Sequence, residues 1–158
     1  MKHLIIALAS AGYVGFIPRG PGTAGTLVGV LAYFLYSPLP PLLYLLTTAA
    51  FFCLACWVAG KAEEIFGRKD SPKIVIDEVT GYLIAMALLP PRPSLLVGGF
   101  LFFRVLDIIK PPPIKWVHAK MAGGLAVVLD DAVAGVYTNL LLRLILFYFP
   151  KFLILWGG

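Results

Sequence analysis

The chain has 158 residues, of which 60% are hydrophobic and 13% charged, and its mean hydropathy is +0.92. Soluble domains contain about 45–50% apolar and about 25% charged residues, so this composition favours a membrane protein over a soluble helical bundle. The net charge is +5, but no Arg/Lys-rich helix or aromatic-studded strand accompanies it, and we expect no nucleic-acid partner. The length predicts a single domain over residues 1–158.

The N-terminal part of the chain predicts a short apolar segment, a loop and a helix. An apolar segment at 3–17 is too short to be a clear membrane span. A turn-rich loop follows at 17–26, where three glycines and two prolines expose backbone amides. Thr23 or Thr26 is expected to cap the next helix, which runs to residue 36 and stops at a proline-rich segment.

The remaining elements are predicted to be helices separated by proline and glycine. An almost wholly apolar run at 42–60 is long enough to cross a bilayer, and its helix is expected to continue to about residue 66 and end near Gly67. The most polar stretch of the chain follows it. Further helices are expected at about 75–89, 94–109 and 124–149, the first two ending at proline runs.

These elements predict an all-α fold: a compact, membrane-embedded bundle of about six helices, with several full spans and shorter, partially inserted helices. The segments 26–36 and 78–89 have only about 11–12 residues, which at 1.5 Å per residue gives roughly 17 Å. A bilayer core is about 30 Å thick. We therefore expect these two helices to insert partially or to pack inside the bundle.

The basic residues are distributed unequally between the two expected ends of the bundle. If the N-terminus and the segments 61–73 and 110–120 share one side, that side holds nine basic residues and the other three, leaving out Arg104. The three are Arg92, Arg143 and Lys151. The positive-inside rule then predicts that the larger group faces the cytoplasm, with anionic membrane lipid as a partner.

Five carboxylates lie in apolar surroundings in three segments: Asp77 and Glu78, Asp107, and Asp130 and Asp131. A carboxylate beside hydrocarbon is costly unless it is paired or bound to a metal. Because no histidine or cysteine cluster supports them, the acids favour a hard cation, Mg²⁺ rather than Zn²⁺. The sequence therefore predicts that the three segments converge on a magnesium site close to the membrane surface.

Simpler interpretations exist for two of the three segments. Asp77 and Glu78 at a helix start would interact favourably with the helix dipole. Asp107 lies three residues from both Arg104 and Lys110, so it could form a local ion pair. Asp130 and Asp131 are harder to explain in this way, because apolar residues surround them on both sides.

Clustered carboxylates with neighbouring basic groups are typical of phosphoryl transfer assisted by Mg²⁺. Amides of the loop at Gly22–Thr26 would suit a phosphate at a helix start, although such a turn is weak evidence by itself. No Cys is followed six residues later by Arg, and neither histidine lies in a Ser-Gly-His setting. We infer that cysteine and histidine nucleophiles of known phosphatase classes are absent.

The order of these motifs resembles the phosphatidylglycerophosphatase A family from about residue 8 to residue 137. The segments that match are 15–18, 21–26, 76–81, 107–111 with Pro113 and Ile114, Gly123 and Gly124, and 129–131 with Ala134 and Gly135. The chain departs from the family pattern at the basic and aromatic connector 115–120. The resemblance implies an all-α, Mg²⁺-dependent phosphatase of the bacterial inner (cytoplasmic) membrane, with its active site toward the cytoplasm. Its substrate would be phosphatidylglycerophosphate, and its product phosphatidylglycerol.

The acidic segments and the family resemblance together predict roles for individual residues. Glu78, Asp107, Asp130 and Asp131 are predicted to hold one or two Mg²⁺ ions, with Asp77 as a further ligand or an orienting group. Catalysis is expected to depend on these five acids and Lys110. The phosphate is predicted to contact Arg104 and Arg19, and the amides of Gly22, Thr23, Gly25 and Thr26. Direct attack by water and a covalent aspartyl-phosphate both remain open.

Two other functions are consistent with the same residues. The first is a phosphatase or phosphotransferase for another lipid or isoprenoid phosphate. The second is a non-enzymatic helical membrane subunit whose acids bind cations along a conduction path. That alternative predicts carboxylates spread through the membrane depth, whereas the sequence places them toward one surface.

Overall fold

The computed structural model describes residues 1–112 and 123–149, which form six α-helices, one 3₁₀-helix and no strand. The elements are α1 (Lys2–Ala9), η1 (Val14–Phe16), α2 (Pro21–Tyr36), α3 (Pro41–Phe66), α4 (Ile76–Ala85), α5 (Pro93–Ile109) and α7 (Gly124–Tyr148). The predicted all-α class is confirmed. The boundaries of α3, α5 and α7 lie within about one residue of those expected, because proline and glycine mark them locally.

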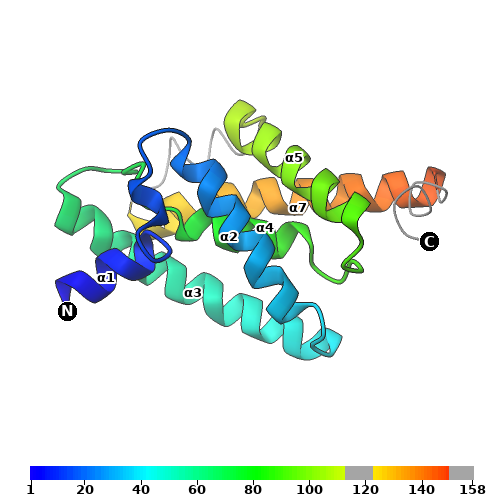
Figure 1. Ribbon diagram of the computed structural model, residues 1–158, viewed down its shortest axis with the longest axis horizontal. Helices are drawn as coiled ribbons and strands as arrows, with labels where there is room; N and C mark the ends of the chain where they lie inside the picture. The colour runs from blue at the N-terminus through cyan, green and yellow to red at the C-terminus, as the bar shows by residue number, and fades with distance from the viewer. Residues whose placement is uncertain (113–122, 150–158) are drawn as a thin grey trace.

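Helix α4 lies at the centre of the bundle, between α2, α3, α5 and α7 (Figure 1). Eight of its ten residues are buried, which fits the expectation that this short helix packs inside the bundle. Two neighbouring helices approach it through glycines. A Cβ added to Gly135 of α7 would lie 2.4 Å from the carbonyl oxygen of Gly81, and one added to Gly29 of α2 would lie 2.8 Å from Tyr82 Cβ. Side chains larger than hydrogen would therefore force these helices apart.

The C-terminal end of α4 differs from the prediction. The helix was expected to continue to Leu89, but it ends at Ala85 and leads into a turn in which Leu88 has a φ of 57°. Asn139 of α7 donates hydrogen bonds to the carbonyl oxygens of Ala85 (2.9 Å) and Ala87 (3.0 Å), and Arg143 also donates to Ala87 (3.0 Å). Side chains from α7 thus satisfy carbonyls that the helix end leaves unpaired, which local sequence does not reveal.

The start of α2 also corrects the sequence analysis. The helix begins at Pro21, and its N-cap is Gly20, with a φ of 69° and no side-chain cap. Neither threonine caps the helix: Thr26 instead donates its hydroxyl to the carbonyl oxygen of Gly22 within the helix (2.9 Å). Proline suits the first helical position because its fixed φ is helical and its missing N–H would have had no partner there. Most of the expected loop is therefore helix.

Two of the described helices, α3 and α7, are long and apolar enough to cross a membrane. This finding supports two candidate spans rather than several, and it rests on length and composition. The most apolar part of α3 is only 28% buried, so leucines such as Leu42, Leu46 and Leu54 are exposed along its outer face. The corresponding part of α7 is 56% buried, because its other face packs on α4.

Candidate active site

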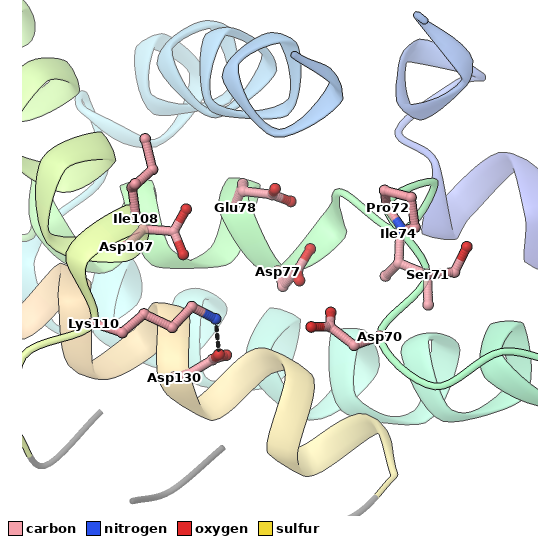
Figure 2. Close-up of a pocket in the computed structure, with 10 residues that line it drawn as sticks. All are labelled: Asp70, Ser71, Pro72, Ile74, Asp77, Glu78, Asp107, Ile108, Lys110 and Asp130. Atoms are coloured by element: carbon pink, nitrogen blue, oxygen red, sulfur yellow. Dashed lines mark hydrogen bonds and ion pairs between the residues drawn. The ribbon is translucent and has the colours of Figure 1, made fainter. Parts of the chain in front are cut away.

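The bundle brings the three acidic segments together. Asp77 and Glu78 lie in the first turn of α4, Asp107 in the last turn of α5, and Asp130 and Asp131 in the first half of α7. Figure 2 shows that four of these acids surround one pocket. Close packing of α4 on α7 makes this possible, since a Cβ on Gly81 would lie 2.8 Å from the carbonyl oxygen of Asp131.

Three carboxylates form the tightest group. Oxygen atoms of Asp77, Glu78 and Asp131 all lie within 4.8 Å of one another. Each of these side chains also has one buried oxygen with no hydrogen-bond partner among the described residues. Buried acceptors normally have partners, and unpaired buried charges are costly. A hard divalent cation, which prefers oxygen ligands, fits this set of donors.

Two basic side chains form ion pairs with the remaining acids. Arg104 Nη1 donates to Asp107 Oδ2 at 2.7 Å and lies 3.9 Å from Glu78 Oε1. Lys110 Nζ forms an ion pair with Asp130 Oδ2. Lys110 is the C-cap of α5 and has a left-handed φ of 46°. Asp107 and Asp130 are thus each held by a basic side chain, whereas Asp77 lies with Glu78 and Asp131.

Burial and the crowding of carboxyls raise the pKa values of both acids in α4. The pKa of Glu78 is raised to about 8, chiefly by burial and also by the charges of Asp131 and Asp107, whereas the neighbouring Asp77 and Arg104 act to lower it. Burial also raises the pKa of Asp77 well above its ordinary value, and the neighbouring Glu78 adds to that rise. Ionising both carboxyls at neutral pH therefore requires positive charge beyond that of Arg104 and Lys110.

The pocket between these groups has a volume of about 280 Å³, and the segment joining α3 to α4 completes it. Asp70, Ser71, Pro72 and Ile74 line the pocket on this side, and the carboxylate of Asp70 points toward Asp77 (Figure 2). No motif in the sequence marks these residues as part of a site. The available signal was their position in the most polar stretch of an apolar chain.

Of the predicted phosphate-binding residues in α2, one lies directly beside the acids. A Cβ added to Gly22 would lie 2.3 Å from Glu78 Oε1 and 3.1 Å from both Nη atoms of Arg104. Only glycine therefore allows the first turn of α2 to approach this ion pair so closely.

The other predicted residues of this segment lie elsewhere. Gly25 is buried against Val75, and Thr26 is buried with its hydroxyl bound within the helix. Thr23 and Arg19 are exposed, and Arg19 forms no ion pair with any residue in the described part of the chain. The structure thus brings Gly22 and Arg104 together with the acids but does not place Gly25 and Thr26 at the pocket. The connector 115–120 with His118 lies outside the described residues.

Comparisons with known proteins agree on one family. The family model described as Phosphatidylglycerophosphatase A matches residues 7–146. The chain is 34% identical over 137 residues to "Phosphatidylglycerophosphatase A" of Escherichia coli, covering 86% of this chain and 80% of that protein. It is 35% identical over 125 residues to the protein of the same name from Haemophilus influenzae, covering 78% and 77%.

A third relative has a different name. The chain is 35% identical over 136 residues to a "Putative phosphatidylinositol-3-phosphatase" of Bacteroides thetaiotaomicron, covering 81% of this chain and 84% of that protein. No solved structure matches the chain.

Proposed function

Because the chain belongs to the phosphatidylglycerophosphatase A family, we propose that it hydrolyses the terminal phosphomonoester of phosphatidylglycerophosphate, giving phosphatidylglycerol and phosphate. Family membership makes it a phosphatase. The observation that supports this reaction best is the group of buried, unpartnered oxygens on Asp77, Glu78 and Asp131, with Arg104 and Lys110 on neighbouring acids.

The site is suited to Mg²⁺. Glu78, Asp131 and Asp77 would hold the ion, since their free oxygens lie close together. The sequence also predicts Asp107 and Asp130 as ligands. Each of them has a basic partner, so each would add negative charge around the pocket instead of binding the ion directly. When bound, Mg²⁺ supplies positive charge that offsets a phosphate dianion and makes a bound water easier to deprotonate.

The basic side chains would position the phosphate. Arg104 is fixed by Asp107 and reaches toward Glu78, so its guanidinium is oriented before substrate arrives. Lys110 is held by Asp130, and the two side chains lie below Asp107 and Glu78 in Figure 2. Together Arg104 and Lys110 would neutralise phosphate oxygens, and preorganised charge of this kind stabilises a phosphoryl-transfer transition state. The helix start at Gly22 adds unpaired backbone amides near Arg104.

A second substrate class follows from one relative. The Bacteroides protein is named for a phosphatidylinositol phosphate, and its match covers 81% of the chain, between the 86% and 78% of the other two relatives. The pocket residues recognise a phosphomonoester and a divalent cation, and they do not distinguish a glycerol from an inositol headgroup. Phosphatidylinositol 3-phosphate is therefore the alternative substrate.

We place the protein in the bacterial inner membrane, with the pocket toward the cytoplasm. Two candidate spans and the large exposed apolar face of α3 support a membrane. The expected excess of basic residues on the pocket side supports the orientation.

The decisive experiment measures phosphate release by the purified protein in detergent. We expect release from phosphatidylglycerophosphate with Mg²⁺, loss with chelator and recovery when Mg²⁺ is restored. Phosphatidylinositol 3-phosphate is tested in parallel and should release phosphate more slowly, because the family model and two of the three relatives are named for phosphatidylglycerophosphate. Faster release from the inositol lipid would favour the alternative substrate, and release that is unaffected by chelator would contradict the magnesium site.

A further inference from the structure

A second, wholly apolar groove lies outside the acidic pocket, between α2 and α5. Its volume is about 230 Å³. Six residues line it, two from α2 and four from α5: Leu27, Val30, Leu96, Val97, Phe100 and Leu101. Leu27, Val97 and Leu101 are each more than half exposed, so the groove opens to the outside of the bundle.

The walls of the groove lead to the acidic site. Helices α2 and α5 run side by side in opposite directions, so the start of α2 and the end of α5 lie at the same end of the bundle (Figure 1). At that end Gly22 contacts Arg104 and Glu78. Leu27 follows Gly22 by five residues and Leu101 precedes Arg104 by three, which is about 7.5 Å and about 4.5 Å along the helix axes. The groove therefore begins about one turn from the residues that would hold the phosphate.

We propose that this groove binds part of one acyl chain of the lipid substrate and thereby orients its phosphomonoester toward the acidic pocket. The inference rests on the proposed function and extends it to a specific substrate subsite. A lipid phosphate is the ligand whose chemistry matches both surfaces: an anionic headgroup for Arg104 and hydrocarbon for Leu27, Val97 and their neighbours. Because surrounding lipid is also apolar, the groove contributes orientation more than overall hydrophobic affinity.

Another apolar groove provides a matched control. It lies between α3 and α4 and is lined by residues that include Ala49, Phe52, Ile84 and Ala87. Ile84 and Ala87 are near the C-terminal end of α4, whereas Asp77 and Glu78 are in its first turn. The two grooves are similarly apolar, but only the one between α2 and α5 adjoins the site.

The kinetic test fills each groove with tryptophan. Leu27→Trp and Val97→Trp fill the groove beside the site, and Ala49→Trp fills the control groove; all three positions are exposed, so the core is not disturbed. Phosphate release is measured from dioleoyl phosphatidylglycerophosphate and from its deacylated headgroup. We expect Leu27→Trp and Val97→Trp to lower kcat/KM for the dioleoyl lipid about tenfold, equivalent to about 1.4 kcal/mol. The headgroup reaction and the Ala49→Trp protein should be unchanged.

A binding test works without turnover. Phosphatidylglycerophosphate with a diazirine in the middle of one acyl chain is photolysed with the wild-type protein, beside a diacylglycerol with the same chain. We expect the phosphorylated probe to label α2 and α5 peptides preferentially and Leu27→Trp to remove that labelling. Equal labelling by both probes, or equal loss of activity on both substrates, would overturn the proposal. Wild-type protein that labels as expected but releases no phosphate would contradict the proposed function and leave the groove supported.

Discussion

At the scale of single residues, Glu78 is a proposed metal ligand whose charge depends on pH. It lies in the three-carboxylate group and faces Arg104, and burial raises its pKa to about 8 from an ordinary value of 4.5. The folded protein without metal therefore binds this proton more tightly than the unfolded chain does. The stabilisation from that proton is complete below about pH 4.5 and is lost as the pH rises toward 8.

The first prediction concerns the ionisation of Glu78. In chelator, the unfolding midpoint of the wild-type protein should fall between pH 5 and pH 8, and Mg²⁺ should restore it. Glu78→Gln cannot ionise, so its midpoint should fall less over this range, while its phosphate release is abolished. Asp131→Asn should also lose phosphate release while remaining folded in detergent.

A matched control for this prediction is Glu64→Gln, because Glu64 forms an exposed ion pair with Lys61 and does not line the pocket. Both its activity and its pH profile should equal those of the wild type. Near-normal turnover by Glu78→Gln and Asp131→Asn would show that the acids do not bind the catalytic ion.

The second prediction concerns Gly22. A methyl group at this position would lie 2.3 Å from Glu78 Oε1, so Gly22→Ala must displace the carboxylate or the start of α2. Phosphate release should fall about tenfold or more, since a misplacement of about 1 Å can cost about a hundredfold. The unfolding midpoint should change little, because alanine favours a helix more than glycine does. Gly98→Ala, where the new Cβ would meet only apolar side-chain atoms of Leu142 and Phe102, should retain activity.

At the scale of elements, the far end of α4 depends on α7. Asn139 donates to the carbonyl oxygens of Ala85 and Ala87, and these bonds fix where α4 ends. Because α4 has only ten residues and is too short to be stable alone, tertiary contacts at both ends determine its position. Its first turn carries Asp77 and Glu78, so the same contacts hold the acidic group in place.

The third prediction tests this connection. Asn139→Ala should remove the two hydrogen bonds to α4 and the one accepted from Arg143, and should lower the free energy of unfolding by about 1–2 kcal/mol, measured as a lower unfolding midpoint in detergent. Thr47→Ala is the control: the hydroxyl of the half-buried Thr47 bonds only within its own helix turn, so its loss should have little effect. A stability of Asn139→Ala equal to that of Thr47→Ala would show that α4 does not need this cap.

At the scale of the whole molecule, the acidic pocket lies at the N-terminal end of α4, and Asn139 holds the C-terminal end of the same short helix. The two helices that are long and apolar enough to cross a membrane are α3, which has a largely exposed outer face, and α7. These two helices, and not the ten-residue α4, predict that the protein crosses the membrane. The inner-membrane location and the single domain over residues 1–158 stay predictions.

The fourth prediction concerns orientation. In a background with Cys53→Ser and Cys56→Ser, single cysteines at Arg68 and Arg92 probe the two ends, and both positions are exposed. A membrane-impermeant maleimide added to intact spheroplasts should label Arg92→Cys and should reach Arg68→Cys only after permeabilisation. The reverse pattern would place the pocket outside the cytoplasm.

The sequence by itself determined the helical class, most helix boundaries and the segments that supply the acids, because apolar runs and proline or glycine breaks act locally. Only the tertiary structure decided which side chains meet. It grouped Asp77 with Glu78 and Asp131 and gave Asp107 and Asp130 basic partners. It also placed Gly22, but not Gly25 or Thr26, beside the acids. The physical reason is that these neighbours depend on how closely α2, α4 and α7 approach, and that distance is set by contacts between residues far apart in the chain.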